Sequence, residues 1–252
     1  MCCFSVPGIP ASLLRRLFSP PLRVSATNIF ARLVTPGVQA LAYGMTLAAT
    51  TELAMILPLP VVPRSGDDAL QFVNLEAHAT LFADLAALFV EPQRKGGFRL
   101  QAKRATLRVH AVGSFIASYV PSRADFARVD PRFRLPDATW DAFPDYADYG
   151  FAVFQLAPGK TTVHPMAFTF PTRTPDRLFF PTVHIHDGRV TRTARFDHAL
   201  YYQAAVEPSA RSQSDAVSWG TPSRSYAGLV DPARQVRRRV IRGRRANVDT
   251  WI

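Results

Sequence analysis

Large apolar residues alternate with small or polar ones along several stretches of the chain, which is the pattern of β-strands that bury one face. The clearest case is 38–48, where every second residue from Leu41 to Leu47 is large and apolar. The neighbouring stretches 28–34 and 52–60 are apolar enough to be strands as well. Because short turns separate the three stretches, we expect an antiparallel meander in which 38–48 pairs with 52–60.

One stretch follows the helical period instead. In 75–90, Leu81, Leu85 and Leu88 lie on one face, as expected of an amphipathic helix. Glu76 stands in the first turn, where the helix dipole favours negative charge. Pro92 follows the end of the stretch and would stop the helix. We therefore predict one helix that packs on the sheet.

The second half of the chain also carries strand patterns. Strands are expected at 105–119, 150–157 and 163–170. Between them, 121–149 is acidic, aromatic and rich in proline, and we interpret it as a packed excursion with a short helix. Asp187 and Gly188 form a dipeptide typical of a two-residue hairpin turn. We expect 178–186 and 190–203 to pair around it.

The composition agrees with one globular domain. The 252 residues are 48% hydrophobic and 19% charged, which is enough apolar surface for a core. Proline outnumbers glycine, 21 to 13, which favours short strands and ordered loops over a helical bundle. We predict an α+β fold, mainly antiparallel β-sheet and sandwich-like, over residues 1–207. A basic extension, 208–252, follows and is expected to be packed on this domain or partly flexible.

The net charge of +11 is concentrated near the end of the chain, since 208–252 holds nine arginines and three aspartates. Arginines in such a run neutralise phosphates, so the segment is a candidate nucleic-acid or anion site. A basic strand or helix laid over the acidic 121–149 segment is the alternative. The candidate residues are Arg237, Arg238, Arg239, Arg242, Arg244 and Arg245.

The sequence also indicates a compartment. The two cysteines are adjacent, so no disulfide framework is expected, which suits a reducing environment. We find no secretory signal, and the longest apolar stretch, 38–62, contains Glu52 and two prolines, so no transmembrane segment is expected. A cytoplasmic protein is the resulting expectation. No glycine-rich phosphate loop and no Cys-x-x-Cys pair is present, which argues against nucleotide-dependent transfer and a zinc ribbon.

Cys2 is the sharpest candidate for catalysis. Removal of Met1 would leave Cys2 with a thiol and a free α-amine, and the amine can accept the thiol proton. With Arg32 at the end of a strand, this start resembles the N-terminal-nucleophile cysteine hydrolases of the choloylglycine hydrolase and penicillin acylase group. The resemblance implies an amide hydrolase in which Cys2 is the nucleophile and Arg32 helps to position it. Burial of the two cysteines in an apolar groove, or their lipid modification, is the alternative.

The histidines form a second candidate site. His184 and His186 lie two residues apart on an expected strand and so share a face, a spacing used by zinc and iron sites in sheets. His164 is the third candidate ligand. In the expected hairpin His186 faces Arg189, which places His198 on the opposite face. Hydrogen-bonded structural histidines are the alternative, and we expect no cofactor unless zinc or iron binds His184 and His186.

Two further segments carry a resemblance to a known group of proteins. They are Glu52-Leu53-Ala54-Met55-Ile56-Leu57-Pro58-Leu59-Pro60 and the run from Leu156-Ala157-Pro158-Gly159 to Phe170-Pro171. Both are similar to segments of uncharacterised bacterial proteins of a domain-of-unknown-function family. The resemblance implies a shared β-rich fold and no particular activity.

Three functions therefore stay open at this point. We expect a β-rich binding or scaffold domain whose partner the sequence does not identify. The alternatives are an amide hydrolase that uses Cys2 and a nucleic-acid-associated basic protein that uses the arginines.

Overall fold

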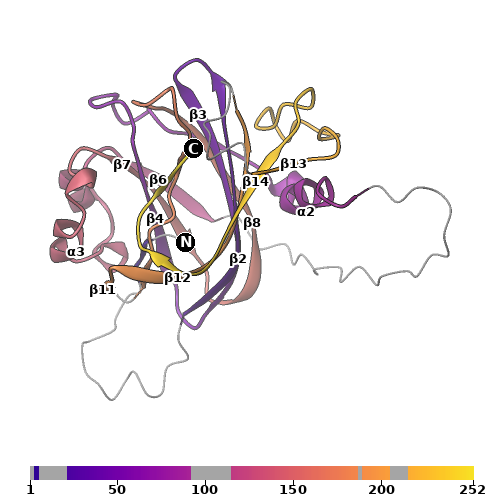
Figure 1. Ribbon diagram of the computed structural model, residues 1–252. Helices are drawn as coiled ribbons and strands as arrows, with labels where there is room; N and C mark the ends of the chain where they lie inside the picture. The colour runs from indigo at the N-terminus through magenta and orange to yellow at the C-terminus, as the bar shows by residue number, and fades with distance from the viewer. Residues whose placement is uncertain (1–2, 6–21, 92–114, 187–188, 205–214) are drawn as a thin grey trace.

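The computed structural model describes residues 3–5, 22–91, 115–186, 189–204 and 215–252. Two β-sheets pack face to face, and helical segments cover the outer face of each (Figure 1). Most neighbouring strands are antiparallel, so the prediction of a β-rich, mainly antiparallel fold is confirmed. In the described part of the chain no helix has the length and apolar character needed to cross a membrane.

The smaller of the two packed sheets has the strand order β11-β10-β1-β4-β7-β6. Its strands are β1 (Cys3–Ser5), β4 (Leu53–Leu59), β6 (Ile116–Val120), β7 (Gly150–Leu156), β10 (Ile185–His186) and β11 (Arg189–Val190). Every residue of β4 is buried, because one face of this central strand meets the other sheet and its second face is also covered. Such a strand has an apolar run instead of an alternating pattern.

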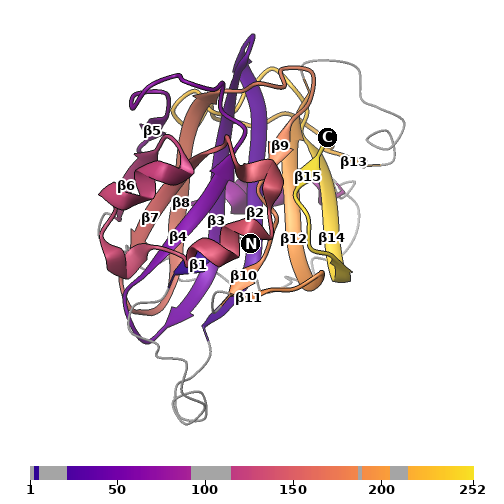
Figure 2. The same ribbon diagram turned by 90° about the vertical axis from the view of Figure 1, so that its left-hand side faces the viewer.

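The larger sheet has the order β13-β14-β12-β2-β3-β8-β5. Its strands are β2 (Arg23–Thr35), β3 (Val38–Ala49), β5 (Gln71–Val73), β8 (Gly159–Pro171), β12 (Thr193–Gln203), β13 (Ala216–Val217) and β14 (Arg237–Ala246). A further pair, β9 (Phe179–Phe180) and β15 (Thr250–Trp251), brings the C-terminus against the sandwich (Figure 2).

Aromatic rings fill the space between the two sheets. Phe154 of β7 and Phe168 of β8 are fully buried, and their ring centroids lie 6.0 Å apart. Phe115 and Phe72 approach Phe154 edge-on, at 5.5 and 5.7 Å. These contacts join four separate segments of the chain, so they hold the two sheets together.

The outer face of the smaller sheet carries the excursion expected at 121–149. It consists of η2 (Arg123–Arg128), η3 (Pro131–Phe133), α3 (Asp137–Asp141) and η4 (Pro144–Tyr146). Phe126 and Trp140 pack on Phe151 of β7, with ring centroids 5.0 and 5.1 Å from it. The aromatic residues of this acidic segment therefore form its attachment to the sheet.

The helix predicted at 75–90 is shorter than expected. A 3-10 turn, η1 (Glu76–His78), precedes α2 (Leu81–Ala87), and the residues after α2 form tight turns that end at the exposed Val90. Leu81 and Leu85 are buried on the larger sheet. The ring of Phe82 in α2 lies where a side chain of Gly44 would be, since a Cβ there would be 2.6 Å from it.

The predicted pairing of 38–48 with 52–60 is wrong, although both segments are strands. β3 pairs with β2 and β8 in the larger sheet, whereas β4 pairs with β1 and β7 in the smaller one. The turn between them therefore crosses from one sheet to the other. An alternating pattern fixes which face of a strand is buried, and it does not fix which strand becomes its neighbour.

The predicted hairpin at Asp187-Gly188 is correct only beside the turn. Ile185 pairs with Val190 and His186 with Arg189, as the two-residue turn requires. Beyond that point the prediction is wrong, because β12 leaves the smaller sheet and pairs with β14 and β2 in the larger one.

The C-terminal segment, expected as an extension of the domain, contributes β14 to the larger sheet and then a clasp, residues 247–252. The Asn247 amide bonds the backbone of His184 and Thr191. The Asp249 carboxylate accepts hydrogen bonds from the N–H groups of Thr182 and Val183 and from the Tyr146 hydroxyl. Burial raises the pKa of Asp249 to about 6, although its three donors oppose the rise.

This raised pKa predicts how stability depends on pH. The folded protein holds the Asp249 proton more tightly than the unfolded chain, so this group stabilises the fold below about pH 4. The contribution is lost as the pH rises through about 6, and it amounts to about 3 kcal/mol. Asp249→Asn keeps the acceptor oxygen and cannot ionise, so urea unfolding of the variant should lack this fall.

The matched control is Asp176→Asn, which changes an exposed aspartate. Between pH 4.5 and pH 7 its free energy of unfolding should change by the same amount as that of the parent. If Asp249→Asn and the parent show the same pH dependence between these values, Asp249 has an ordinary pKa and the interpretation fails.

Candidate functional site

Strand β14 lies near one edge of the larger sheet and holds the arginines singled out from the sequence. It pairs with β12 along its whole length. On its other side β13 pairs only with Arg237 and Arg238. Among the described residues, β14 from Val240 to Ala246 pairs with no strand on that side. Figure 1 shows β14 and β13 on the same side of the molecule as α2.

Two of the candidate arginines are engaged within the protein. The Arg238 guanidinium lies over the Phe89 ring, 4.3 Å from its centroid, in a cation–π contact. Arg239 forms an ion pair with the buried Asp215 carboxylate, at 3.0 Å, and Asp215 also accepts a hydrogen bond from Tyr202. These two arginines fasten the start of β14 to the fold.

At the other end of β14 the arginines are exposed. Cross-strand pairing places Arg242 opposite Asp197 and Arg244 opposite Arg195, on the face of the sheet that also carries α2. Arg192 and Arg245 lie at the same end of the two strands. We call these five residues the arginine cluster: Arg192, Arg195, Arg242, Arg244 and Arg245.

The charge of the arginine cluster is poorly compensated. Within the described part of the chain none of the five forms an ion pair. The one cross-strand carboxylate, Asp197, accepts a hydrogen bond from the backbone of Ala26. Arg244 donates to the Thr193 hydroxyl. Adjacent like charges repel, so an anionic partner at this end would be favourable.

Exposed apolar side chains gather at the start of β14. Trp219 is 60% exposed and Val90 is 70% exposed, and the N–H of Trp219 bonds the carbonyl of Leu88, close to Val90. Val240 is 46% exposed and lies on the same face of β14 as Arg238, which contacts Phe89. We call these three residues the apolar patch: Val90, Trp219 and Val240. A group of exposed apolar residues beside charged ones is typical of an interaction surface.

Sequence reasoning missed the apolar patch. Trp219 stands in a stretch of serine, glycine and proline without a periodic pattern, so nothing local predicts its neighbours. A large aromatic residue in such a polar stretch is the one signal that could have drawn attention to it. Its proximity to α2 depends on contacts between segments far apart in the sequence.

Arg32 was expected to be the cation beside Cys2. Arg32 lies on the outer face of the larger sheet, where Nε and Nη2 donate to the carbonyls of Leu229 and Gly228 at 2.6 and 2.9 Å. Cys2 lies outside the described residues, and the next residue, Cys3, starts β1 in the smaller sheet. The larger sheet thus lies between Arg32 and β1, and the role of Arg32 beside Cys2 stays a prediction.

The histidines are arranged differently from the expected metal site. The ring of His184 stacks on that of His198, with centroids 5.1 Å apart, and both are buried next to Phe196. Burial keeps the pKa of His198 far below its usual range, and the neighbouring His184 lowers it further. His198 reaches His184 because β12 lies in the opposite sheet, which corrects the expectation that the hairpin separates them.

The side chains of His164 and His186 lie outside the description, so a metal site that includes them stays a prediction. Among the described side chains, no group of three or more histidine, cysteine, aspartate or glutamate residues could hold a metal ion. His164 stands on β8, which two strands separate from β12 and its His198.

Comparison with known proteins extends the description of the fold. No model of a known protein family matches the chain, and no curated protein matches it. A crystal structure of baculovirus P35 aligns with a TM-score of 0.51 at 15% sequence identity, covering 91% of this chain and 96% of that chain. A chain in a crystal structure of the caspase-8/P35 complex aligns with a TM-score of 0.48 at 14% identity, covering 90% and 95%. The first likeness shows a shared fold and concerns the fold alone.

Proposed function

We propose that this protein is a binding protein that docks an acidic, extended segment of a partner protein along the free edge of β14. The observation that carries the proposal is the edge of β14 from Val240 to Ala246, which pairs with no other described strand on one side. It has exposed arginines at one end and exposed apolar residues at the other. Edge strands present backbone donors and acceptors that a further strand can use.

The geometry suits an added strand. Its backbone would bond the open side of β14 between Val240 and Ala246. Side chains of a strand alternate, so every second one would lie on the face of Arg242 and Arg244. Carboxylates there would form charge-assisted hydrogen bonds with the guanidinium groups. Apolar side chains further along would cover Trp219 and the rest of the apolar patch.

Nucleic acid is the alternative partner for the same arginines. Two of the six expected phosphate contacts, Arg238 and Arg239, are engaged with Phe89 and Asp215 instead. Exposed valines and an open strand edge also favour a protein segment over a phosphate backbone. We therefore favour a protein partner and treat an oligonucleotide as an outcome of the test.

A folded protein can also supply the docking segment. P35 forms a complex with caspase-8. Because this chain shares the P35 fold, caspase-8 is the first folded protein to test as its partner.

The proposal predicts the response of a defined probe. A fluorescent peptide of alternating glutamate and valine residues should bind the parent protein, and Arg242→Glu should weaken its affinity about tenfold, because repulsion replaces attraction. Trp219→Ala should weaken binding by removing apolar contact. Fluorescence anisotropy measures both effects. The charge-matched control is Arg64→Glu, which alters an exposed arginine in the loop between β4 and β5 and should leave the affinity unchanged.

A second peptide separates strand addition from simple charge attraction. Methylation of alternate backbone nitrogens removes the donors that would bond β14 and leaves the charge unchanged, so this peptide should lose most of its affinity. Equal binding of both peptides would refute docking by strand addition. Tighter binding of a single-stranded oligonucleotide than of the peptide, with the same sensitivity to Arg242→Glu, would identify nucleic acid as the partner.

A further inference from the structure

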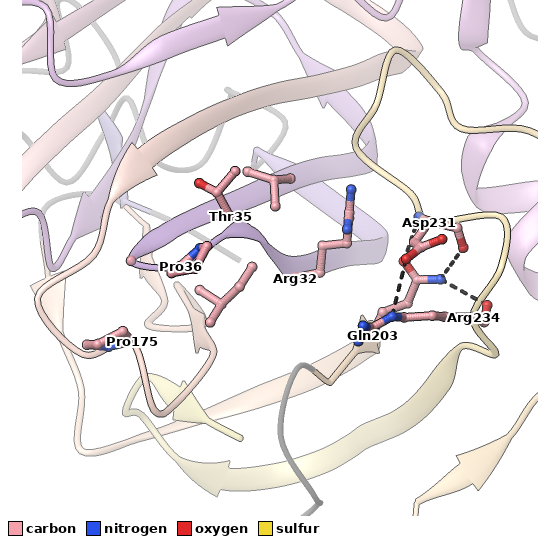
Figure 3. Close-up of a pocket in the computed structure, with 10 residues that line it drawn as sticks. Arg32, Thr35, Pro36, Pro175, Gln203, Asp231 and Arg234 are labelled. Carbon is pink, nitrogen blue, oxygen red and sulfur yellow. Dashed lines mark hydrogen bonds and ion pairs between the residues drawn. The ribbon is translucent and has the colours of Figure 1, made fainter.

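A pocket opens at the end of β2, away from the arginine cluster. Its volume is about 430 Å³, and it is lined by residues of the β2–β3 turn, by Pro175 and by Gln203, Asp231 and Arg234. Figure 3 shows Thr35, Pro36 and Pro175 on one side, the bonded group of Gln203, Asp231 and Arg234 on the other, and Arg32 between them. One wall is therefore largely apolar and the other is polar.

The polar wall is held in place by its own hydrogen bonds. The Gln203 amide donates to the carbonyls of Asp231 and Arg234, at 2.7 and 3.0 Å, and accepts from the N–H of Asp231 at 2.8 Å. The Asp231 carboxylate forms an ion pair with Arg234 at 3.2 Å, and Arg234 Nη1 donates to the carbonyl of Ala204. A ligand would thus meet groups that are already ordered, which lowers the entropic cost of binding.

Arg32 supplies a cation that forms no ion pair with the described residues. Two of its nitrogens are fixed by the carbonyls of Leu229 and Gly228. Among the described residues, no carboxylate lies within ion-pair distance of it. Burial lowers the pKa of Arg32, the Asp231 carboxylate raises it, and the positive charge of Arg234 lowers it again. The two guanidinium groups are therefore close enough to repel each other. The third nitrogen, Nη1, has no hydrogen-bond partner among the described residues.

We infer that this pocket binds a small organic carboxylate, with its charged group between Arg32 and Arg234 and its apolar body against Leu33, Pro36 and Pro175. The site is independent of the docking surface on β14. Guanidinium groups bind the two oxygens of a carboxylate with directional, charge-assisted hydrogen bonds. The pocket volume is at the lower end of the range for small-molecule sites, so a compact ligand fits.

The apolar wall decides between two kinds of anion. Inorganic phosphate would satisfy the guanidinium groups and would leave the proline and leucine side chains in contact with water. A carboxylate with an apolar body covers both walls, so it gains the burial of apolar surface as well as the ionic contact. The expected order of affinity is therefore benzoate above acetate and above inorganic phosphate.

Benzoate is a suitable probe, and benzamide is its neutral match in shape. Titration of the full chain with benzoate should shift the backbone amide resonances of Thr35 and Gly37 saturably, in two-dimensional NMR spectra. Benzamide should bind at least tenfold more weakly, because it has no charge. Arg234→Gln should weaken the affinity for benzoate at least fivefold. Arg242→Glu, on the docking surface, should leave this affinity unchanged.

Arg32→Gln is the stronger test, since it removes the anchored cation. Arg32 also bonds the backbone of 228–229, so the benzoate affinity of this variant is informative only if its melting temperature stays close to that of the parent. If the melting temperature falls, the test rests on Arg234→Gln. Three results would overturn the inference: no saturable shift with benzoate, equal affinity for benzoate and benzamide, or a preference for phosphate over benzoate. An unchanged benzoate affinity in Arg234→Gln would overturn it as well.

Discussion

Phe154→Ala should lower the free energy of unfolding by about 4 kcal/mol, the largest effect expected of a single substitution described here. Phe154 is fully buried, and its ring touches Phe72, Phe115 and Phe168, which come from three other segments. Removing the ring loses its burial and leaves a cavity that the two sheets cannot close without shifting. Urea unfolding monitored by circular dichroism measures the loss.

The matched control for Phe154→Ala is Trp219→Ala, which removes an aromatic ring that is 60% exposed. Its free energy of unfolding should change by less than about 0.5 kcal/mol, as for most surface substitutions. The contrast would show that Trp219 serves binding more than folding. A loss of several kcal/mol in Trp219→Ala would mean that the apolar patch is part of the structural core, and it would weaken the proposed docking surface.

Asn247→Ala should cost about 3 kcal/mol of unfolding free energy. The Asn247 side chain accepts from the N–H of His184 at 2.7 Å and donates to the carbonyls of His184 and Thr191 at 2.9 Å each. Alanine would leave the buried N–H and carbonyl of His184 and the part-buried carbonyl of Thr191 without their partner, and each unsatisfied buried group costs about 1 kcal/mol or more. Thermal and urea unfolding of the variant measure the effect.

A control for Asn247→Ala is Asn74→Ala. The Asn74 side chain accepts one hydrogen bond, from the N–H of Glu76, at an exposed turn where water can replace it. The expected cost is below about 1 kcal/mol. Equal losses in the two variants would show that the clasp at the C-terminus does not hold the strands as its hydrogen bonds indicate.

The candidate sites differ in how far the sequence could predict them. The run Arg237–Arg245 was evident as an anion-binding candidate from its composition, but its exposed half could not be separated from the half that is engaged. Asp215 lies 24 residues from Arg239, and Phe89 precedes Arg238 by far more. Such pairs depend on tertiary contacts, which no local pattern records. The pocket at Arg32 likewise joins four segments of the chain.

The sequence by itself determined that 38–48 and 52–60 become strands. In 38–48 the large apolar residues recur with the two-residue period of a pleated backbone, and 52–60 is a short apolar run that suits a strand covered on both faces. Ile185 pairs with Val190 and His186 with Arg189, as the Asp187-Gly188 dipeptide predicted. These features depend on residues near one another in the chain.

Only the tertiary structure decided which strands are neighbours. β3 and β4 follow one another in the chain and lie in different sheets, and β12 leaves the hairpin to pair with β14. Any apolar strand face satisfies the requirement for burial equally well, so the choice depends on how all the side chains pack between the two sheets. That packing brings His198 to His184, separates Arg32 from β1, and places Trp219 beside Leu88 at the end of α2.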